Sequence, residues 1–273
     1  MTNPTVTTAD FPQRITFFKA EDVIPDALIL QLATFTVPVE GDDVVVTVPH
    51  IDVDDDAGFV PQGDDIPLAD PDTGSIDIVT GKVAVLGKVS RESYVQDGIP
   101  GLLSASFKRA LIKKANRALL AQPAPVSPAI TPPAGLLSQG VTDGGAIGAS
   151  LDELIDAVAT IRTAYGTPTA VVANPLAFAS LAKRKRGTGS EEALVTDLAA
   201  QLGVPPLFTP SMPAGEFLIV DKAAVLGTWG QVSLAVSADA FFGSDSIGVR
   251  GTFRFGARIV DAERVVKLTI ADA

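Results

Sequence analysis

The sequence predicts an α+β fold with one long excursion from its body, and three observations lead to this. Alternating residues separated by turn signals indicate a two-stranded ribbon within residues 37–90. A helical period replaces this alternation over residues 101–121. From residue 144 onward, helical stretches alternate with short apolar strands. The chain has 273 residues and 47% hydrophobic content, so it can bury a sizeable core as one large domain or two smaller ones.

Before the ribbon, residues 26–34 have the pattern of a short helix with Asp26 near its N-terminus. The ribbon itself is acidic, because no Lys or Arg occurs between Ala20 and Gly81. Like charges repel, so we expect the ribbon to stand in solvent or against a basic neighbour. An isolated two-stranded ribbon is also marginally stable in water, which means that it needs a surface to lie on. The acids that we assign to this contact are Asp54, Asp55, Asp56, Asp64 and Asp65.

The helix predicted over residues 101–121 has two chemically different faces. At about 100° per residue, its apolar side chains fall on one arc and its cations on the other. The apolar arc consists of Phe107, Leu111, Ile112, Ala115, Ala118 and Leu119. The cationic arc consists of Arg109, Lys113, Lys114 and Arg117. Five prolines within residues 122–133 then end the helix and form a stiff connector.

The second half of the chain predicts a series of short elements. We expect helices over 151–161, 175–182 and 191–202, and strands over 169–173, 216–220 and 231–236. One long strand, broken near Ala262, is expected over 248–270. The basic run 183–186 fits the end of a helix about as well as it fits nucleic-acid binding.

The residues needed for catalysis are scarce. The chain has no Cys and a single His, His50, which lies in the acidic ribbon and which we interpret as an exposed residue. Phosphate-binding glycine loops and the His-Glu-x-x-His zinc motif are absent from the sequence. We therefore expect no enzyme activity, no metal and no cofactor. No stretch approaches the roughly 20 apolar residues of a membrane span, and the net charge of −11 argues against general affinity for nucleic acid.

The order of these elements is more specific than any single motif. The exit strand of the ribbon reads KVAVLGKVSRES (82–93), and the α/β part contains TAVVANPLAFASL (169–181). LGVPPLFTPSMPAGEFLIVD (202–221) and VRGTFRFGARIVDAERVVKLTI (249–270) follow. In this order, over essentially the whole chain, the sequence resembles the major capsid proteins of tailed bacteriophages, which have the Hong Kong 97 fold.

The resemblance implies a division of the chain into five parts. These are an N-arm (1–33), an extended E-loop ribbon (34–93), a peripheral domain with a long spine helix and Pro-rich loop (94–145), an axial α/β domain (146–240), and the C-terminal strands of the peripheral domain (241–273). It implies a structural subunit that assembles through pentamers and hexamers into an icosahedral shell around double-stranded DNA. Such shells form in the host cytoplasm, and their further partners are scaffolding, portal and decoration proteins.

The resemblance also implies roles for charged residues. It places the spine helix near the shell interior, so Arg109, Lys113, Lys114 and Arg117 would form a genome-facing basic face in weak, nonspecific contact with DNA. It lays the ribbon across a neighbouring subunit, whose candidate partners for the acids are Arg91, Arg250, Arg254, Arg258 and Arg264. Some family members cross-link covalently through an E-loop Lys, but this ribbon has no Lys before Lys82, so we expect a noncovalent shell. The beginning of the sequence leaves no room for the long scaffolding segment of some relatives, and we expect a separate scaffolding protein or none.

Two other functions remain open. An encapsulin, a nanocompartment shell of the same fold that packages an enzyme, is the main alternative, although the long arm and acidic ribbon favour the viral form. An α/β enzyme with an unrecognised site is the third, and the absence of a nucleophile–His–acid set disfavours it.

Overall fold

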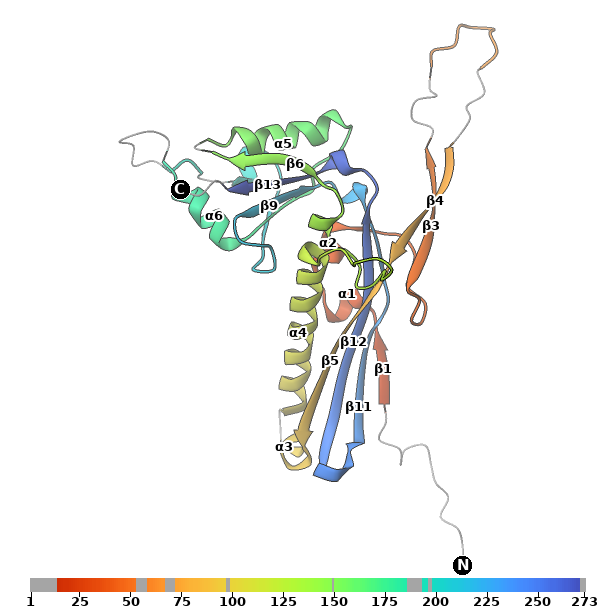
Figure 1. Ribbon diagram of the computed structural model, residues 1–273, viewed down its shortest axis with the longest axis vertical. Helices are drawn as coiled ribbons and strands as arrows, with labels where there is room; N and C mark the ends of the chain where they lie inside the picture. Colours follow the sequence, from red (N-terminus) through yellow and green to blue (C-terminus); the bar gives the residue numbers. More distant parts are fainter. Residues whose placement is uncertain are drawn as a thin grey trace, which may run out of the picture.

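The computed structural model describes residues 14–52, 58–66, 72–96, 99–148, 150–185, 193–195 and 198–270. The molecule has an elongated body, a second body at one end of it, and a two-stranded ribbon that extends away from both (Figure 1). The elongated body contains the long helix α4 beside the longest strands, and the second body contains a separate sheet with its own helices.

A six-stranded sheet forms the elongated body. Its strands are β1 (Arg14–Phe18), β2 (Thr34–Phe35), β5 (Gly81–Ser90), β10 (Val225–Trp229), β11 (Val232–Phe241) and β12 (Ser246–Ile259). β12 is the central strand, since it pairs antiparallel with β5, β10 and β11. One 3₁₀ turn, η5 (Phe242–Ser244), joins β11 to β12.

Helix α4 (Ile99–Ala121) covers one face of this sheet, as the helical period predicts. Its residues Leu111 and Ala115 pack with Val83 of β5 and Phe253 of β12, all of them buried. Gly251 of β12 also lies against Leu111, with no room for a larger side chain between them. The odd-numbered residues of β12 therefore face the helix, and its even-numbered residues lie on the opposite face of the sheet.

Three short helices pack near α4: α1 (Ala20–Val23), α2 (Leu28–Leu32) and α3 (Arg91–Val95). α2 lies within the predicted 26–34 helix, but Asp26 does not cap it. The cap residue is Ala27, and the amide of Leu28 donates instead to Oδ1 of Asn116 on α4, at 2.8 Å. A tertiary hydrogen bond thus replaces the expected local one.

The second body contains a five-stranded mixed sheet in the order β6-β13-β9-β7-β8. These strands are β6 (Thr142–Ile147), β7 (Ala170–Ala173), β8 (Pro206–Phe208), β9 (Glu216–Val220) and β13 (Val265–Ile270). Helices α5 (Asp152–Thr163), α6 (Pro175–Ala182) and α7 (Leu198–Leu202) pack on it around a core of their own. The helix predicted over 191–202 is shorter than expected: only Leu198–Leu202 is helical and residues 193–195 are not, while residues 191–192 and 196–197 lie outside the described residues. The connector ends in a 3₁₀ turn, η3 (Leu136–Ser138).

The strand predicted over 248–270 is two strands in different sheets. It breaks at the 3₁₀ turn η6 (Ala262–Arg264), after which β13 joins the second body rather than the sheet of β12. The chain also passes between the bodies at η4 (Lys222–Ala224). Buried Asp221 holds this junction together, because it accepts hydrogen bonds from the amides of Thr167 and Ala223 and pairs with Arg264.

The ribbon is shorter than the 37–90 excursion that the alternation predicts. β3 (Val45–Asp52) pairs antiparallel with β4 (Asp72–Val79), whereas residues 81–90 form β5 inside the long sheet. The chain turns at buried Thr80, where it passes close to β12. A Cβ at Gly256 would overlap the carbonyl oxygen of Val79, so only glycine permits this approach.

Replacing Gly256 with Ala should therefore destabilise the protein by about 1–3 kcal/mol, the usual cost of forcing extra atoms into a packed site. Thermal unfolding of the full chain measures this. Gly74→Ala is the matched control, because a Cβ at Gly74 of β4 meets no atom within 4 Å. Equal stability of the two variants would contradict the close approach at the ribbon root.

Candidate assembly surfaces

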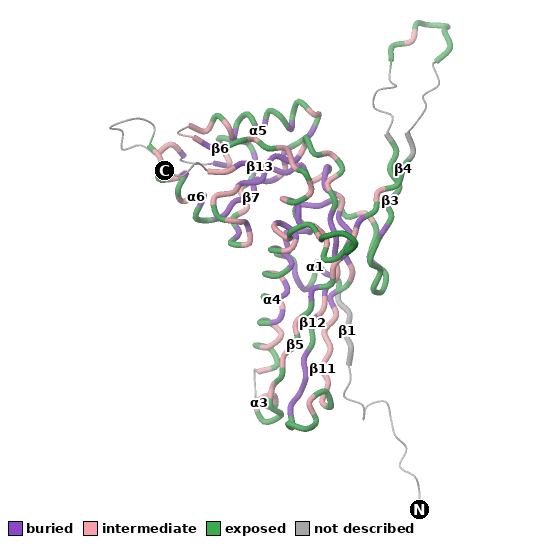
Figure 2. The backbone as a smooth tube through the Cα atoms, in the orientation of Figure 1, coloured by how far each residue is buried: buried purple, intermediate pink, exposed green. Residues whose placement is uncertain are grey.

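The ribbon is an exposed, largely acidic surface. Its strands and tip are mostly exposed in Figure 2, and Asp64 and Asp65 at the tip are exposed. Phe59 is fully exposed there and Ile66 is 82% exposed. Asp54, Asp55 and Asp56 lie outside the described residues. Exposed large apolar side chains such as Phe59 and Ile66 are typical of surfaces that contact another molecule.

Charged contacts hold the root of the ribbon on the long sheet. Lys82 Nζ lies 3.0 Å from Asp42 Oδ1, and Arg254 Nε lies 3.5 Å from the same atom. Arg254 also donates to Thr80 Oγ1 at 2.9 Å. The hydrogen bond from Lys82, followed by its charge and that of Arg254, lowers the pKa of Asp42 below 3.8. These contacts fix the direction in which the ribbon leaves the sheet.

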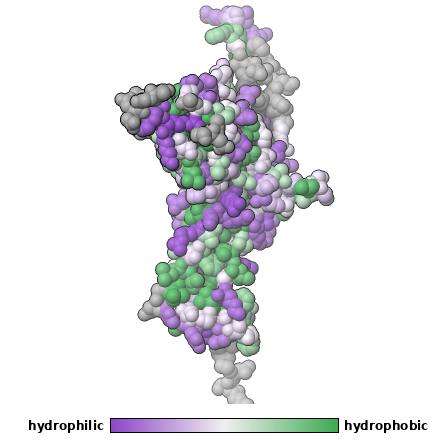
Figure 3. Space-filling model, turned by 60° about the vertical axis from the view of Figure 1, so that its left-hand side comes forward, coloured by the Kyte–Doolittle hydropathy of each residue, from purple (hydrophilic) through white to green (hydrophobic). Residues whose placement is uncertain are grey.

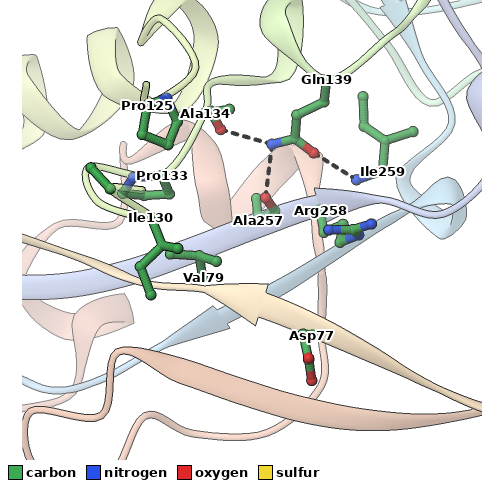
Figure 4. A pocket seen from close by; sticks show the side chains of 11 residues that line it. Asp77, Val79, Pro125, Ile130, Pro133, Ala134, Gln139, Ala257, Arg258 and Ile259 are labelled. Carbon is green, nitrogen blue, oxygen red and sulfur yellow. Dashed lines mark hydrogen bonds between the residues drawn. The ribbon is translucent and has the colours of Figure 1, made fainter. Parts of the chain in front are cut away.

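A pocket of about 340 Å³ lies beside this root, between β4, the Pro-rich connector and β12 (Figure 4). Gln139 joins the connector to β12: its Nε2 donates to the carbonyls of Ala134 and Ala257, and its Oε1 accepts from the amide of Ile259. The other walls are mostly apolar, and Asp77 and Arg258 are the charged lining residues. The lining contains no pair of groups suited to acid–base catalysis, and its hydrogen bonds serve to hold the connector.

The five candidate arginines differ in what they contact. Arg91 pairs with Asp245 at 2.8 Å, Arg264 pairs with Asp221, and Arg254 pairs with Asp42. Arg254 and Arg264 are thus engaged in partly buried contacts of their own chain, while the Arg91 pair is exposed. Arg250 and Arg258 are exposed and have no ion pair within the described part of the chain.

Arg250 belongs to a larger surface that was not predicted from the sequence. Cross-strand partners share a face, so Arg250 lies beside Leu86, Gly248 beside Lys88, and Arg254 beside Lys82. We call this surface the open sheet face, since it lies opposite α4: Lys82, Ala84, Leu86, Lys88, Ser90, Arg250, Thr252 and Arg254. Except for Leu86, which is 64% exposed, it carries only small or basic side chains. Lys82 and Lys88 are an even number of residues apart, as are Arg250 and Arg254, so each pair lies on one face of its strand. This spacing could have indicated the surface from the sequence.

The predicted cationic arc of α4 is also exposed. Arg109, Lys113, Lys114 and Arg117 all face solvent, and none has an ion-pair partner among the described residues. Figure 3, turned toward the side that carries α4, shows a hydrophilic band above an apolar area. The apolar end of the helix includes Leu102, which is 68% exposed.

Neither a metal-ligand cluster nor a membrane-spanning helix occurs in the part of the chain that the structure describes. No cluster of three or more His, Asp or Glu side chains there could hold a metal ion. His50 is exposed in β3. No described helix has the length and apolar character needed to cross a membrane.

The family model of the phage capsid family matches residues 21–270. The chain belongs to the phage capsid family. No curated protein matches it. Among solved structures, that of Gordonia phage Cozz is 16% identical with a TM-score of 0.69, covering 90% of this chain and 87% of that one. The structure from Mycobacterium phage Bobi is 16% identical with a TM-score of 0.69, and the match covers 90% of this chain and 91% of that one. The capsid of an empty GTA particle is 17% identical with a TM-score of 0.66, covering 90% of each chain.

These comparisons confirm the Hong Kong 97-type fold expected from the sequence. The protein is a structural subunit of the phage capsid family, located in the virion capsid. The nanocompartment alternative is not favoured, since the matched family and the similar structures are phage and GTA capsids.

The lowered pKa of Asp42 leads to a pH prediction. A carboxylate whose pKa is lowered by folding stabilises the fold above its unfolded pKa, and this contribution disappears as the pH falls through the folded pKa. We expect the protection factors of the amides at residues 79–82, which are corrected for the pH dependence of intrinsic exchange, to fall only below about pH 4, close to the ordinary pKa of Asp. Asp42→Asn should show the lower protection already at pH 7.

Asp43→Asn is the matched control, since only the backbone carbonyl of Asp43 contacts Thr80 and Arg254. Unchanged exchange in Asp42→Asn at pH 7, or an equal acceleration in both variants, would show that the carboxylate of Asp42 does not hold the ribbon root.

Proposed function

We propose that this capsid subunit assembles through pentamers and hexamers into an icosahedral shell around double-stranded DNA, with its ribbon lying on the open sheet face of a neighbouring copy. The observation that carries this proposal is that one chain presents both an exposed acidic ribbon and an exposed basic sheet face, two surfaces of complementary charge. Assembly takes place in the host cytoplasm, with scaffolding, portal and decoration proteins as further partners. In this proposal the ribbon is the E-loop, the elongated body is the peripheral domain and the second body is the axial domain. The bounds expected from the sequence change accordingly: β5, β10 and β11 belong with the peripheral domain and β13 belongs with the axial domain.

Charge and shape both support the contact between ribbon and sheet. The ribbon tip carries Asp64 and Asp65, and the open sheet face presents Arg250 and Lys88. Small side chains between these cations leave a flat surface on which a two-stranded ribbon can lie. Each exposed ion pair contributes only about 0–1 kcal/mol, but a closed shell repeats the contact at every subunit.

The apolar part of the contact strengthens this argument. Phe59 and Ile66 at the tip are almost fully exposed, and Leu86 is an exposed apolar side chain on the open sheet face. Burying a large apolar side chain contributes about 1.5–3 kcal/mol, which exceeds a surface ion pair. Charge thus selects and orients the contact while these apolar residues supply much of its free energy.

Reversing the charge on either surface should impair assembly. We expect Arg250→Glu, and separately Asp64→Lys with Asp65→Lys, to raise the protein concentration needed for shell formation several-fold. Combining the two sets should restore part of the loss, because opposite charges then face each other again. Light scattering and electron microscopy of the assembled full chain measure this.

Arg162→Glu, at an exposed position of α5, is the control for a change in net charge. If the combined variant assembles no better than either parent, the acids at the tip do not meet Arg250. Thermal unfolding of each variant separates loss of assembly from loss of folding.

The cationic face of α4 supports the second half of the proposal, contact with packaged DNA. Cations at a DNA surface release counterions, an attraction that is independent of sequence and weakened by salt. We expect Lys113→Glu with Arg117→Glu to form shells of normal shape that retain less DNA, with the larger loss at low ionic strength, where repulsion is less screened. DNA content per particle is the measurement. Equal content at every salt concentration would mean that this face is only solvated.

A further inference from the structure

A groove lies between α4 and the loop that follows β8 in the second body. It has a volume of about 890 Å³. Arg109, Lys113 and Arg117 line it from the helix, and residues 209–214 line it from the loop. The cationic face of α4 is therefore not a flat surface over its whole width, because three of its four cations border a walled hollow.

The spacing of these three cations is regular. They are four residues apart, so at 1.5 Å per residue they form a row with steps of about 6 Å along the helix axis. Asp26 is the only acid among the lining residues. The fourth cation, Lys114, lies elsewhere: it lines a different hollow, together with Lys82 and Arg254. The groove is thus positively charged along one wall, and its cations form a line parallel to the helix axis.

Asn116 gives the groove a neutral donor as well. Its side chain lines the groove, although the residue is only 8% exposed. Oδ1 accepts from the amide of Leu28, which sets the orientation of the side-chain amide because only oxygen can accept. The Nδ2 group carries the two donor hydrogens of this side chain, and no hydrogen bond from it to another described residue is found. These hydrogens are available to a ligand in the groove that carries acceptor oxygens.

We propose that this groove is a phosphate-binding site, in which Arg109, Lys113, Arg117 and the Nδ2 group of Asn116 hold successive phosphates of one nucleic-acid strand. The inference rests on the proposed function, which turns α4 toward the genome, and it adds a defined site to that face. Phosphodiester groups offer charge and acceptor oxygens at regular intervals, and Arg binds them with two parallel hydrogen bonds. The carboxylates of an acidic peptide lack this fixed repeat, so phosphate is the ligand that the row of cations favours.

The test uses the full-length chain below the concentration at which it assembles. The probes are a fluorescent 12-nucleotide single strand and, as a competitor, inorganic phosphate. Each phosphate contact contributes a slope of about −0.7 to the dependence of log affinity on log salt for a single strand. Lys113→Ala should reduce the slope by about one such contact, whereas Lys114→Ala, on the same cationic face but outside the groove, should reduce it by clearly less.

A second variant, Asn116→Asp, tests the contribution of the Nδ2 group of Asn116 to binding. An aspartate keeps an acceptor for the amide of Leu28 but replaces the NH₂ group with a negatively charged oxygen. We expect at least fivefold weaker binding of the oligonucleotide. Should this variant unfold, as thermal unfolding would show, the comparison of Lys113→Ala with Lys114→Ala still decides the question.

An equal reduction of the salt-dependence slope in Lys113→Ala and Lys114→Ala would contradict the phosphate site in the groove. It would leave the proposed genome-facing surface intact. Tighter binding of poly-glutamate than of the oligonucleotide would overturn phosphate as the ligand. Competition by inorganic phosphate at millimolar concentration in the parent, but not in Lys113→Ala, would support the site and identify free phosphate as a second source. Normal DNA content in Lys113→Glu, Arg117→Glu shells, together with the expected slopes, would support the site while removing the proposed genome contact.

Discussion

The packing of α4 on one face of the long sheet is the contact on which the rest of the structure depends. Leu111 and Phe253 are essentially inaccessible to solvent there, and each such side chain contributes about 1.5–3 kcal/mol to folding. A single helix covers a single face, so this contact leaves two surfaces uncovered: the outer arc of the helix and the reverse side of the sheet. Both uncovered surfaces carry several cations, among them Lys113 on the helix and Arg250 on the sheet. The surfaces proposed for DNA and for the neighbouring ribbon are therefore the two outer sides of one two-layer sandwich.

Local patterns predicted most of the elements, and long-range pairing determined where they went. The period of α4 is visible in the sequence because its apolar positions recur over many turns. Alternation continues as far as residue 90, so the sequence predicted a ribbon that reaches there. The break at Thr80 depends instead on contacts with Arg254 and on the passage over Gly256. The break near Ala262 was predicted correctly, but nothing local indicates that β13 joins a different sheet from β12.

The candidate site residues divide in the same way. Helical geometry was enough to place Arg109, Lys113, Lys114 and Arg117 on an exposed arc. The sequence could not show that Arg264 is held by Asp221, 43 residues away, or that Arg254 is held at the ribbon root. Asn116 carries no sequence signal at all, because its importance comes from the amide of a distant short helix. Charge and period are local properties, whereas the availability of a charged group is a property of the folded chain.

The positions of β12 and β13 in chain order have a consequence for biosynthesis. β12 is the central strand of the long sheet, and β13 lies between β6 and β9 in the other, yet both follow every other described strand in the sequence. On the ribosome, neither sheet can close until these two strands have emerged. The basic face that Arg250 completes is likewise absent from every shorter nascent chain. Neighbouring nascent chains on one messenger thus carry acidic ribbons before any of them carries a finished partner surface, which delays association until translation has passed β12.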